Sequence, residues 1–366
     1  MNPQTAANSP VAVHKFGGAS VRDAAAIANL EALLGKLGPG QERMVIVVSA
    51  MGKTTNALER ALELRLSGVP AALAAESVMA AHRLEQRALG LGDEVLDEAF
   101  AGLIASEARY ESWVSWGEHF STLLVAAYLK KCGHPVRWAD ASQLIRTDGG
   151  HPEAAVDWPA TERRCEALAA ELQAEPGWIV TQGFIGGTSL PADASAAGER
   201  RTTLGREGSD FSGALIARGV KADRLTIWKD VPGMMNADPR IWPDAICLDE
   251  VDFADALAMS RAGAGVIHHK TVLPLQAAGL ELHVKCFAEP GVPGTVIRKA
   301  GQKKYPAPLI AFAEYPEGVR EVSILNAEPN EARAIIEKKF PSWSIETSRQ
   351  EGAMAVLRCR ISIRLR

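Results

Sequence analysis

The sequence predicts an α/β protein built on a mainly parallel β-sheet. Three segments carry this prediction: an apolar strand at Val11–Phe16, a helical stretch from Val21 to Leu37, and a continuous apolar, β-branched run at Met44–Ala50. A run without polar alternation is typical of a strand buried on both faces. Strands that alternate with helices in this way pair in parallel and carry the helices on the faces of the sheet.

The following segments continue the alternation of helices and strands. Residues 54–131 are mostly helix formers with apolar side chains three and four positions apart, and Gly117–Lys131 is the most regular helix among them. Gly186–Arg200, rich in Gly, Ala, Ser and Asp, is expected to be a mobile surface loop. The other expected elements are strands at Trp178–Thr181, Arg224–Trp228, Leu282–Phe287 and Gly294–Ile297, and a helix at Ser209–Arg218.

The composition changes near residue 301. Gly301–Tyr305 reads GQKKY and is followed by Pro306 and Pro308, which predicts a linker. Beyond it, the pattern predicts a strand, a helix and two strands, at Glu321–Leu325, Glu331–Lys339, Ser344–Thr347 and Ala353–Ile363. We therefore expect a large domain over residues 1–300 and a short α+β segment over residues 301–366.

The overall composition is that of an ordinary soluble globular protein. Of 366 residues, 47% are hydrophobic and 23% charged, and the net charge of −4 does not favour general nucleic-acid binding. No apolar run approaches the ~20 residues that span a bilayer, and the N-terminus lacks the features of a signal peptide. The five cysteines are scattered without a CxxC pattern, which fits a reducing compartment. We expect a cytoplasmic protein.

The segment KFGGAS, Lys15–Ser20, is the first that carries chemistry. It places a lysine at a strand end and two glycines, Gly17 and Gly18, where the backbone turns. Glycines let a phosphate approach free backbone N–H groups, and the lysine would bridge phosphate oxygens. A plain tight turn with a surface lysine explains the segment equally well. Its spacing matches neither GxGxxG nor GxxxxGK[ST], so dinucleotide and Walker sites lack support.

The segment TTLGREGSD, residues 202–210, immediately precedes a predicted helix. Arg206 could hold a carboxylate through two parallel hydrogen bonds. Asp210 could orient a phosphate-bound metal ion or a catalytic lysine. Ser209 and Asp210 would also cap the helix, and a capping role is compatible with a functional one.

Two further segments have a functional and an ordinary interpretation. WKDVPGMMNADPR, Trp228–Arg240, follows a strand whose carboxyl end is where α/β proteins bind ligands, although an ordinary β-α connection would look similar. Lys229, Asp230 and Arg240 could meet the ribose and phosphates of a nucleotide. Glu118 of GEH could meet a substrate ammonium group or simply interact with the helix dipole.

Neither the histidine pair His268-His269 nor the arginine-rich tail 358–366 predicts a functional site. Adjacent histidines do not share a helix face, so a metal pair is not expected there. The alternating arginines of RCRISIRLR indicate the solvated face of a strand rather than a nucleic-acid-binding arm.

Taken together, these motifs resemble those of aspartate kinases in the amino-acid kinase superfamily. The match runs in order through residues 15–297 and includes several long motifs. They are KFGGASV, VVSAMGKTTN (47–56), GEHFST (117–122), TQGFIGG (181–187), RTTLGREGSDFS (201–212), WKDVPGMMNADPR (228–240), GAGVIHHKT (263–271) and PGTVI (293–297).

The resemblance implies a fold and an activity. The fold is a three-layer α/β/α sandwich with a mainly parallel sheet, followed by ACT modules. The activity is phosphorylation of the side-chain carboxylate of L-aspartate by MgATP to give 4-phospho-L-aspartate, the first step toward lysine and diaminopimelate, threonine and methionine. A homodimer is implied, and the magnesium ion would be carried by ATP, with no protein ligand assigned.

The resemblance also implies roles for individual residues. Lys15 and Asp210 match the catalytic positions, with Lys15 bridging phosphates. Ser49, Thr55, Glu118, Arg206 and Ser209 match positions around the aspartate. The nucleotide side comprises Gly17, Gly18, Ser20, Lys229, Asp230, Met235, Arg240 and Gly265.

The chain departs from the family pattern at three places. Gly265 stands where a lysine that touches the ATP phosphates is frequent, with His269 where proline is usual, and Lys229 could supply the charge instead. Met235 stands where tyrosine is common. About 65 residues follow residue 300, enough for one ACT-like unit or a truncated remnant, so we expect weak or absent feedback control. A related kinase for another acidic substrate and a non-catalytic regulatory or binding homologue are the alternatives.

Overall fold

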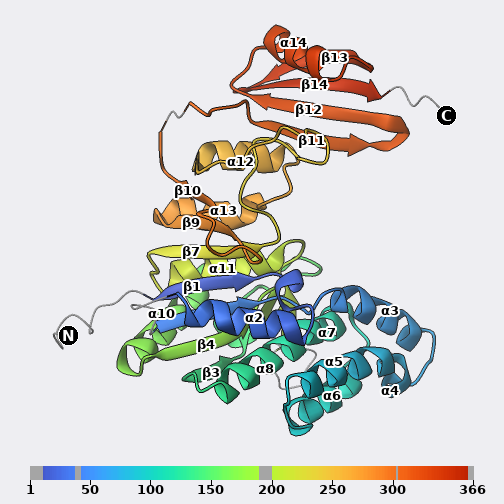
Figure 1. Ribbon diagram of the computed structural model, residues 1–366. Coiled ribbons are helices and arrows are strands. Elements are labelled where there is room, and N and C mark those ends of the chain that lie inside the picture. Colours follow the sequence, from blue (N-terminus) through green and yellow to red (C-terminus); the bar gives the residue numbers. More distant parts are fainter. Residues whose placement is uncertain (1–10, 38–42, 189–199, 302–303, 362–366) are drawn as a thin grey trace, which may run out of the picture.

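The computed structural model describes residues 11–37, 43–188, 200–301 and 304–361. Within them, the main sheet contains eight strands in the order β3-β4-β2-β1-β7-β9-β10-β8 (Figure 1). The first six of this order run parallel, β10 is antiparallel to β9, and β8 is parallel to β10. The mainly parallel sheet is thus confirmed. The strands are β1 Ala12–Phe16, β2 Arg43–Val48, β3 Val136–Ala139, β4 Gly177–Gln182, β7 Arg224–Lys229, β8 Glu250–Asp252, β9 Glu281–Cys286 and β10 Thr295–Arg298.

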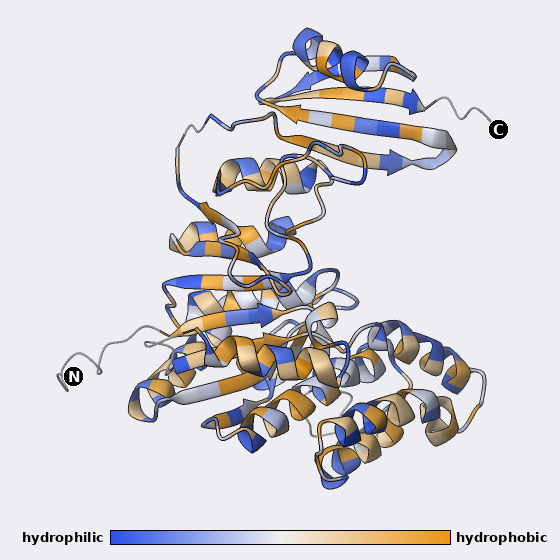
Figure 2. Cartoon of the chain, viewed as in Figure 1, coloured by the Kyte–Doolittle hydropathy of each residue, from blue (hydrophilic) through white to orange (hydrophobic). Residues whose placement is uncertain are grey.

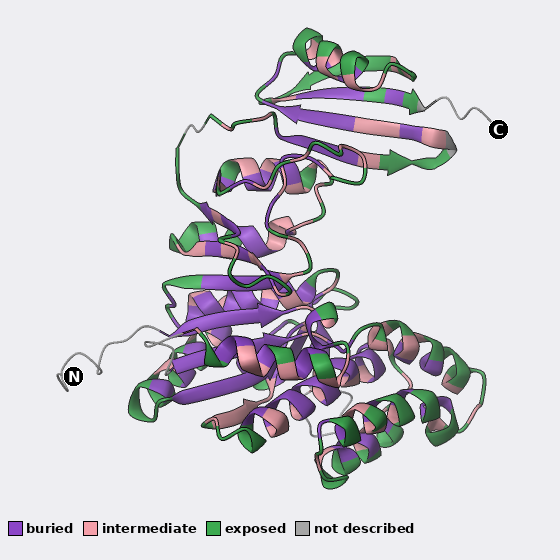
Figure 3. Cartoon of the chain, in the orientation of Figure 1, coloured by how far each residue is buried: buried purple, intermediate pink, exposed green. Residues whose placement is uncertain are grey.

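Helices cover both faces of this sheet, because alternate residues of each strand enter two different apolar cores. Val13 of β1 belongs to the core under α10, α11 and α13, whereas Phe16 belongs to the core under α2 and α8. Central strands are therefore buried along their whole length (Figure 3). The layered sandwich is confirmed. The helices are α2 Ala24–Gly35, α8 Trp116–Lys131, α10 Trp158–Ala174, α11 Gly208–Gly219 and α13 His269–Ala278.

The helix-rich region before α8 forms a lobe at one side of the sandwich (Figure 1). Its amphipathic helices bury one side against the α2–α8 core and leave the other in solvent, as the striped colouring of Figure 2 shows. The helices are α3 Thr54–Leu66, α4 Ala71–Ala74, α5 Glu76–Ala88, α6 Glu94–Ala105 and α7 Tyr110–Val114, and a short α9 Ala141–Leu144 lies further on.

Two predicted segments differ from the structure. The first helix begins later than expected: a 3₁₀ turn η1, Gly18–Val21, precedes α2, and Asp23 is the N-cap that accepts a hydrogen bond from the Ala26 N–H. The ends of the expected loop at 186–200 belong to a hairpin of β5 Ile185–Thr188 and β6 Arg200–Thr203, and residues 189–199 lie outside the described residues. A Cβ on Gly187 would lie 2.3 Å from the Ser142 carbonyl oxygen, so this glycine reflects close packing rather than looseness.

A separate four-stranded antiparallel sheet forms the C-terminal region, in the order β11-β12-β14-β13. The expected strand-helix-strand-strand unit is present, but β11, which the sequence analysis missed, adds a strand before it. The core between this sheet and its helix also includes Ala237, and Ile241 and Trp242 pack against it, so the segment after β7 supports the C-terminal region. The elements are β11 Ile310–Tyr315, η2 Pro316–Gly318, β12 Val319–Leu325, α14 Pro329–Lys339, β13 Trp343–Glu351 and β14 Met354–Ile361; α12 Phe253–Arg261 lies beneath it.

Candidate active site

A pocket of about 870 Å³ opens at the carboxyl ends of β1, β2 and β7. This is the edge of a parallel sheet at which α/β proteins bind ligands, and the volume lies at the upper end of the roughly 300–1,000 Å³ typical of small-molecule sites. One wall comes from α8 and the other from the loop that leads into α11. The lining residues are Lys15, Gly17, Gly18, Ala19, Ser20, Ser49, Ala50, Gly52, Thr55, Tyr110, Glu118, Pro152, Glu153, Phe184, Gly205, Arg206, Glu207, Gly208, Ser209, Trp228, Lys229 and Asp230.

The loops after β1 and β2 form the floor of the pocket and hold each other. The Ser49 N–H donates to the Phe16 carbonyl, and the Gly52 N–H donates to the Gly18 carbonyl. A Cβ on Gly18 would lie 2.8 Å from the Ala50 carbonyl oxygen, so only glycine fits at this crossing. The glycines predicted to admit a phosphate thus also keep the two loops in contact.

Lys15 and Asp210 meet at the floor of the pocket. Lys15 has the same orientation on β1 as Val13, toward α11, because side chains alternate along a strand. Its Nζ lies 2.5 Å from Asp210 Oδ1, and its side chain is 7% exposed. Contrary to the prediction from the sequence, Ser209 and Asp210 do not cap the helix. α11 begins at Gly208 with Glu207 as the N-cap residue, so Asp210 lies inside the first turn and faces the strand ends.

Lys229 is the second cation on Asp210. Lys15 is in register with Ile227 on the neighbouring parallel strand, so Lys229 lies one pleat repeat beyond on the same face. Its Nζ lies 2.8 Å from Asp210 Oδ2, while Asp210 itself is fully buried. Burial alone would raise the pKa of Asp210, but the two ammonium groups outweigh it and hold this pKa below its ordinary value.

Glu118 projects into the pocket from the first turn of α8. Its Oε1 accepts a hydrogen bond from the Ala50 N–H at 3.2 Å, whereas Oε2 has no hydrogen-bond partner among the described residues. Burial raises the pKa of Glu118 to about 8, although backbone hydrogen bonds and the charge of Lys15 lower it in part. A buried carboxyl group with a free oxygen is poised to accept a donor from a ligand.

The other residues expected around an amino acid also line this pocket. Arg206 is exposed at the mouth, and within the described part of the chain no carboxylate forms an ion pair with it. Ser49, Thr55 and Ser209 add hydroxyl groups. The Ser121 hydroxyl donates to the Ser49 carbonyl at 2.7 Å, which ties the loop after β2 to α8.

The residues expected on the nucleotide side divide into two groups. Gly17, Gly18, Ser20, Lys229 and Asp230 line the pocket. Met235, Arg240 and Gly265 do not line it, because they lie on the segments beyond. Arg240 is exposed and paired with Asp238, Met235 forms a bridge with Cys247, and a Cβ on Gly265 would contact nothing within 4 Å.

Several pocket residues were given no role from the sequence, although two of them, Phe184 and Glu207, lie inside the quoted motifs TQGFIGG and RTTLGREGSDFS. Phe184 and Glu207 line the pocket with φ of 67° and 56°, a left-handed conformation that few non-glycine residues adopt. Tyr110 donates to Glu59 Oε1 at 2.9 Å. Glu153 forms an ion pair with Lys270 at 2.5 Å. The backbone conformation of Phe184 and Glu207 and the polar contacts of Tyr110 and Glu153 depend on tertiary packing, so residue type alone did not reveal them.

His119, which follows Glu118 in GEH, does not line the pocket and has a supporting role. Its Nδ1 lies 3.0 Å from an Arg201 guanidinium nitrogen, and that guanidinium lies over the Trp116 ring. Burial lowers the pKa of His119 to about 3, so the ring is neutral and accepts the hydrogen bond. This contact joins α8 to β6, which leads into the Arg206 loop.

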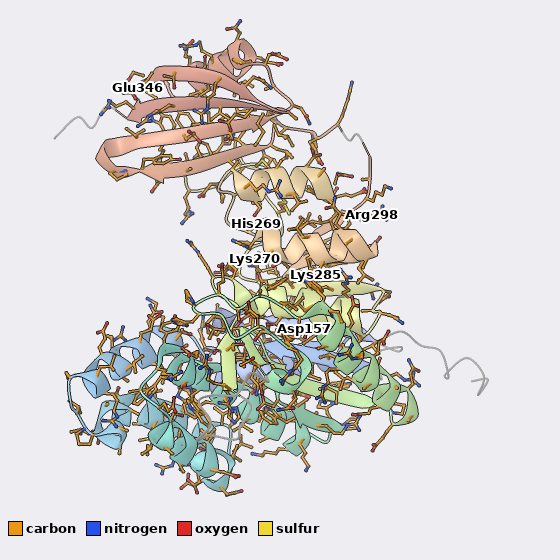
Figure 4. The ribbon with its side chains drawn as sticks, turned by 180° about the vertical axis from the view of Figure 1, so that it is seen from behind. Asp157, His269, Lys270, Lys285, Arg298 and Glu346 are labelled. Carbon is orange, nitrogen blue, oxygen red and sulfur yellow. The ribbon has the colours of Figure 1, made fainter. Side chains whose placement is uncertain are left out.

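His269 and Lys270 lie at the beginning of α13 (Figure 4), and His268 precedes them. His268 Nδ1 accepts from the Lys270 N–H, so this histidine is the N-cap of the helix. Among the described residues, no group of three His, Cys, Asp or Glu side chains could hold a metal ion. No described helix is long and apolar enough to cross a bilayer.

The chain is similar to a known protein family and to individual proteins of known name. The model of the Amino acid kinase family matches residues 10–286. Lysine-sensitive aspartokinase 3 of Escherichia coli K12 is 37% identical over 207 residues, 56% of this chain and 43% of that protein. Aspartokinase 2, chloroplastic, of Arabidopsis thaliana is 31% identical over 310 residues, 79% of this chain and 54% of that protein. The chain thus spans about half the length of these relatives.

Solved structures share the fold. Aspartokinase III of E. coli in complex with lysine and aspartate superposes with a TM-score of 0.67 at 25% identity, covering 96% of this chain and 79% of that chain. Clostridium acetobutylicum aspartate kinase gives a TM-score of 0.69 at 21% identity, covering 96% and 78%. Because these matches cover 96% of the chain, the shared fold includes the C-terminal antiparallel sheet.

Proposed function

The chain belongs to the amino acid kinase family, and we propose that it transfers the γ-phosphoryl group of ATP to the side-chain carboxylate of L-aspartate, forming 4-phospho-L-aspartate. The observation that carries this proposal is Glu118, a fully buried carboxyl group whose Oε2 has no partner among the described residues. The α-ammonium group of an amino acid would donate a hydrogen bond to this oxygen and would balance the negative charge of the ionised carboxylate. The relatives named aspartokinase support aspartate as the amino acid.

The amino-acid end of the pocket has groups for each polar part of aspartate. Glu118 would accept hydrogen bonds from the ammonium group. Arg206, exposed at the mouth, would bind a carboxylate with the planar two-point geometry that guanidinium offers. The hydroxyls of Ser49, Thr55 and Ser209 would complete the hydrogen bonds around the substrate.

The phosphate end of the pocket lies at Lys15, Lys229 and Asp210. Lys15 would bind the transferring phosphoryl group, and Asp210 would orient both lysines. Gly17, Gly18 and Ser20 would lie under the phosphates, and Asp230 would lie toward the ribose. Met235, Arg240 and Gly265 would contribute only if the segment after β7 and the one before α13 moved toward the pocket.

The chemical step needs positioning and charge stabilisation more than proton transfer. The aspartate side chain is already ionised at neutral pH, so its oxygen attacks the γ-phosphorus without a general base. The bond from the γ-phosphorus to the bridging oxygen breaks, and its electron pair remains on ADP. Preorganised cations at the floor of the pocket stabilise the charge that develops.

The magnesium ion would enter as part of MgATP. Mg²⁺ is usually held by substrate phosphates with one or two protein carboxylates. Glu153, Glu207 and Asp230 are the exposed carboxylates that line the pocket, and Glu153 is already paired with Lys270, which leaves Glu207 and Asp230 as the candidates. Asp210 is less suited, because both its oxygens are occupied by lysines. When bound, the ion would neutralise phosphate charge.

The proposal extends to the organisation of the protein. Residues 1–300 would form the catalytic domain, and residues 301–366 a single ACT-like segment with weak or absent feedback control. A homodimer in the cytoplasm, acting in the aspartate-derived amino-acid pathway, fits the resemblance and the five free cysteines. Sedimentation of the purified chain would test the dimer.

Trapping of the acyl phosphate by hydroxylamine tests the proposed function. Incubation with MgATP and L-aspartate should give a coloured hydroxamate, and L-glutamate in its place should not. Hydroxamate from glutamate alone would identify a kinase for another acid. No hydroxamate from any acidic amino acid would indicate a non-catalytic homologue. Lys36→Met is a matched control, because Lys36 is exposed at the end of α2 and does not line the pocket.

A further inference from the structure

The charge at the floor of the pocket is unbalanced. Asp210 is fully buried and carries one negative charge, yet two ammonium groups contact it, Lys15 on Oδ1 and Lys229 on Oδ2. The lysine side chains are only 7% and 17% exposed. Two buried cations with one buried anion leave one positive charge without a close partner. Such a charge is costly to bury unless another anion completes the cluster.

The neighbouring carboxyl groups do not supply that anion. Glu118 is near enough for Lys15 to lower its pKa, but burial keeps this pKa at about 8, so the group is mostly protonated at pH 7. Glu207 Oε2 is 4.0 Å from Lys229 Nζ, and its side chain is 45% exposed, so this contact is weak and solvated. Among the described residues, no further carboxylate forms an ion pair with either lysine.

The two ammonium groups have a fixed geometry. Both lysines extend from the same face of adjacent parallel strands and are held on opposite oxygens of one carboxylate. Lys15 lies on the side of Glu118, whereas Lys229 is the last residue of β7 and precedes Asp230. The pair therefore spans the pocket floor from the amino-acid end toward the nucleotide end.

We propose that Lys229 is a second catalytic cation, which binds the phosphate next to the transferring group while Lys15 binds the transferring group itself. This assignment deepens the proposed function and rests on it for the chemical step. When the bond from the γ-phosphorus to the bridging oxygen breaks, the electron pair stays on the terminal phosphate of ADP. Lys229 donates a hydrogen bond to that phosphate, and no proton has to be transferred.

The assignment gives Asp210 a defined task. It holds two lysines that would otherwise repel each other, at positions where adjacent phosphates can contact both. The phosphates then supply the negative charge that the cluster lacks. Lys229 thus binds phosphate in addition to neutralising Asp210. The contribution of Lys229 to phosphate binding can be measured separately.

Titration of ADP with excess Mg²⁺, followed by calorimetry, tests the inference without turnover. Lys229→Met should weaken ADP binding about 10- to 100-fold, the range for one lost hydrogen bond to a charged group. Lys229→Arg should recover part of the affinity, because it keeps the charge. Lys36→Met should bind ADP like the unchanged protein. Thermal unfolding of each variant shows whether it is folded.

A second pair of variants separates phosphate binding from neutralisation of Asp210. If Lys229 only neutralised Asp210, Lys229→Met would have no effect once the carboxylate is removed by Asp210→Asn. We expect the loss of ADP affinity to persist between Asp210→Asn and the double variant. Equal affinities in these two proteins would overturn the inference, as would an absence of ADP binding by the unchanged protein.

The outcome is independent of the test of function. If hydroxamate formed from no acidic amino acid but Lys229→Met still weakened ADP binding in both backgrounds, Lys229 would be a phosphate-binding residue and the proposed reaction would be wrong. If hydroxamate formed with unaltered turnover and ADP affinity in Lys229→Met, the function would stand and Lys229 would have only a structural role.

Discussion

The two sheets of the molecule differ in whether their charged side chains are buried or exposed. At the carboxyl ends of the parallel sheet, Asp210, Lys15 and Glu118 are almost completely buried. On the C-terminal antiparallel sheet, charged side chains such as Glu346 and Arg360 pair at the surface, where both remain partly exposed. Exposed pairs form at little cost and contribute little, whereas buried charges are costly unless other groups complete them.

This difference shows where a ligand is needed. On the described strands of the antiparallel sheet, the arginines pair with carboxylates of the same sheet, so these charges have partners without a ligand. The pocket has an excess cation at its floor and a carboxyl oxygen without a partner on its wall. Together these call for an anion at one end and an ammonium group at the other, and the following changes test that contrast in order of expected effect.

Loss of either charge at the pocket floor should have the largest effect. Lys15→Ala and Asp210→Ala should each lower turnover by ~100-fold, because one preorganised charge contact contributes roughly 3 kcal/mol to lowering the barrier. Steady-state ADP production by the purified variants measures this, with circular dichroism to confirm the fold. Turnover close to that of the unchanged protein would remove the altered residue from catalysis.

A change at the pocket mouth should act on one substrate. Arg206→Lys should raise the KM for aspartate about 10-fold and leave the KM for ATP nearly unchanged, because lysine keeps the charge but loses the two-point contact. Initial rates with each substrate varied in turn give both constants. A raised KM for ATP alone would place Arg206 on the nucleotide side instead.

The protonation of Glu118 should change when aspartate binds. With a pKa of about 8, this carboxyl group is mostly protonated at pH 7 before binding, and an ammonium group favours its ionised form. Binding should therefore release up to about one proton. Calorimetry in buffers of different ionisation enthalpy measures the release, and Glu118→Gln should abolish it. Equal proton release by both proteins would exclude Glu118 as its source.

The same raised pKa affects stability in the ligand-free protein. The folded chain holds a proton that the unfolded chain releases above its ordinary pKa of 4.5. The resulting stabilisation is fully present below pH 4.5 and is lost as the pH rises through about 8. Glu118→Gln should flatten this part of the pH dependence of the free energy of unfolding.

A surface pair on the C-terminal sheet should have the smallest effect. Glu346→Ala removes the partner of Arg358 and Arg360, and its free energy of unfolding should fall by less than about 1 kcal/mol, because exposed ion pairs contribute little. Turnover should not change. Denaturant unfolding measures the first quantity, and a loss of several kcal/mol would contradict the contrast between the two sheets.

The pocket-lining residues that were named from the sequence include several that follow strands or begin helices. Lys15, Ser49 and Lys229 come at or directly after parallel strands, and Glu118 begins an apolar helix, so their convergence follows from the topology. The meeting of Lys15 and Lys229 on one carboxylate could not be predicted, because it depends on the register of β1 with β7. Arg240 is paired with its neighbour Asp238 in solvent, which the motif does not reveal.

The fold was predicted where burial gives a continuous apolar pattern. The central strands were predicted to within about two residues because both their faces are buried. β3, whose residues are only half-buried, and the three-residue β8 gave no such pattern and were missed. β11 follows two prolines closely, and its burial ends halfway along the strand, so its pattern is equally weak.

A crystal structure with ADP and L-aspartate tests the central claim most directly, because the claim is that each end of the pocket binds one part of the reaction. The account predicts the ammonium group of aspartate within hydrogen-bond distance of Glu118 Oε2, and the terminal phosphate of ADP in contact with Lys229. Aspartate bound away from Glu118, or ADP phosphates that avoid both Lys15 and Lys229, would contradict it.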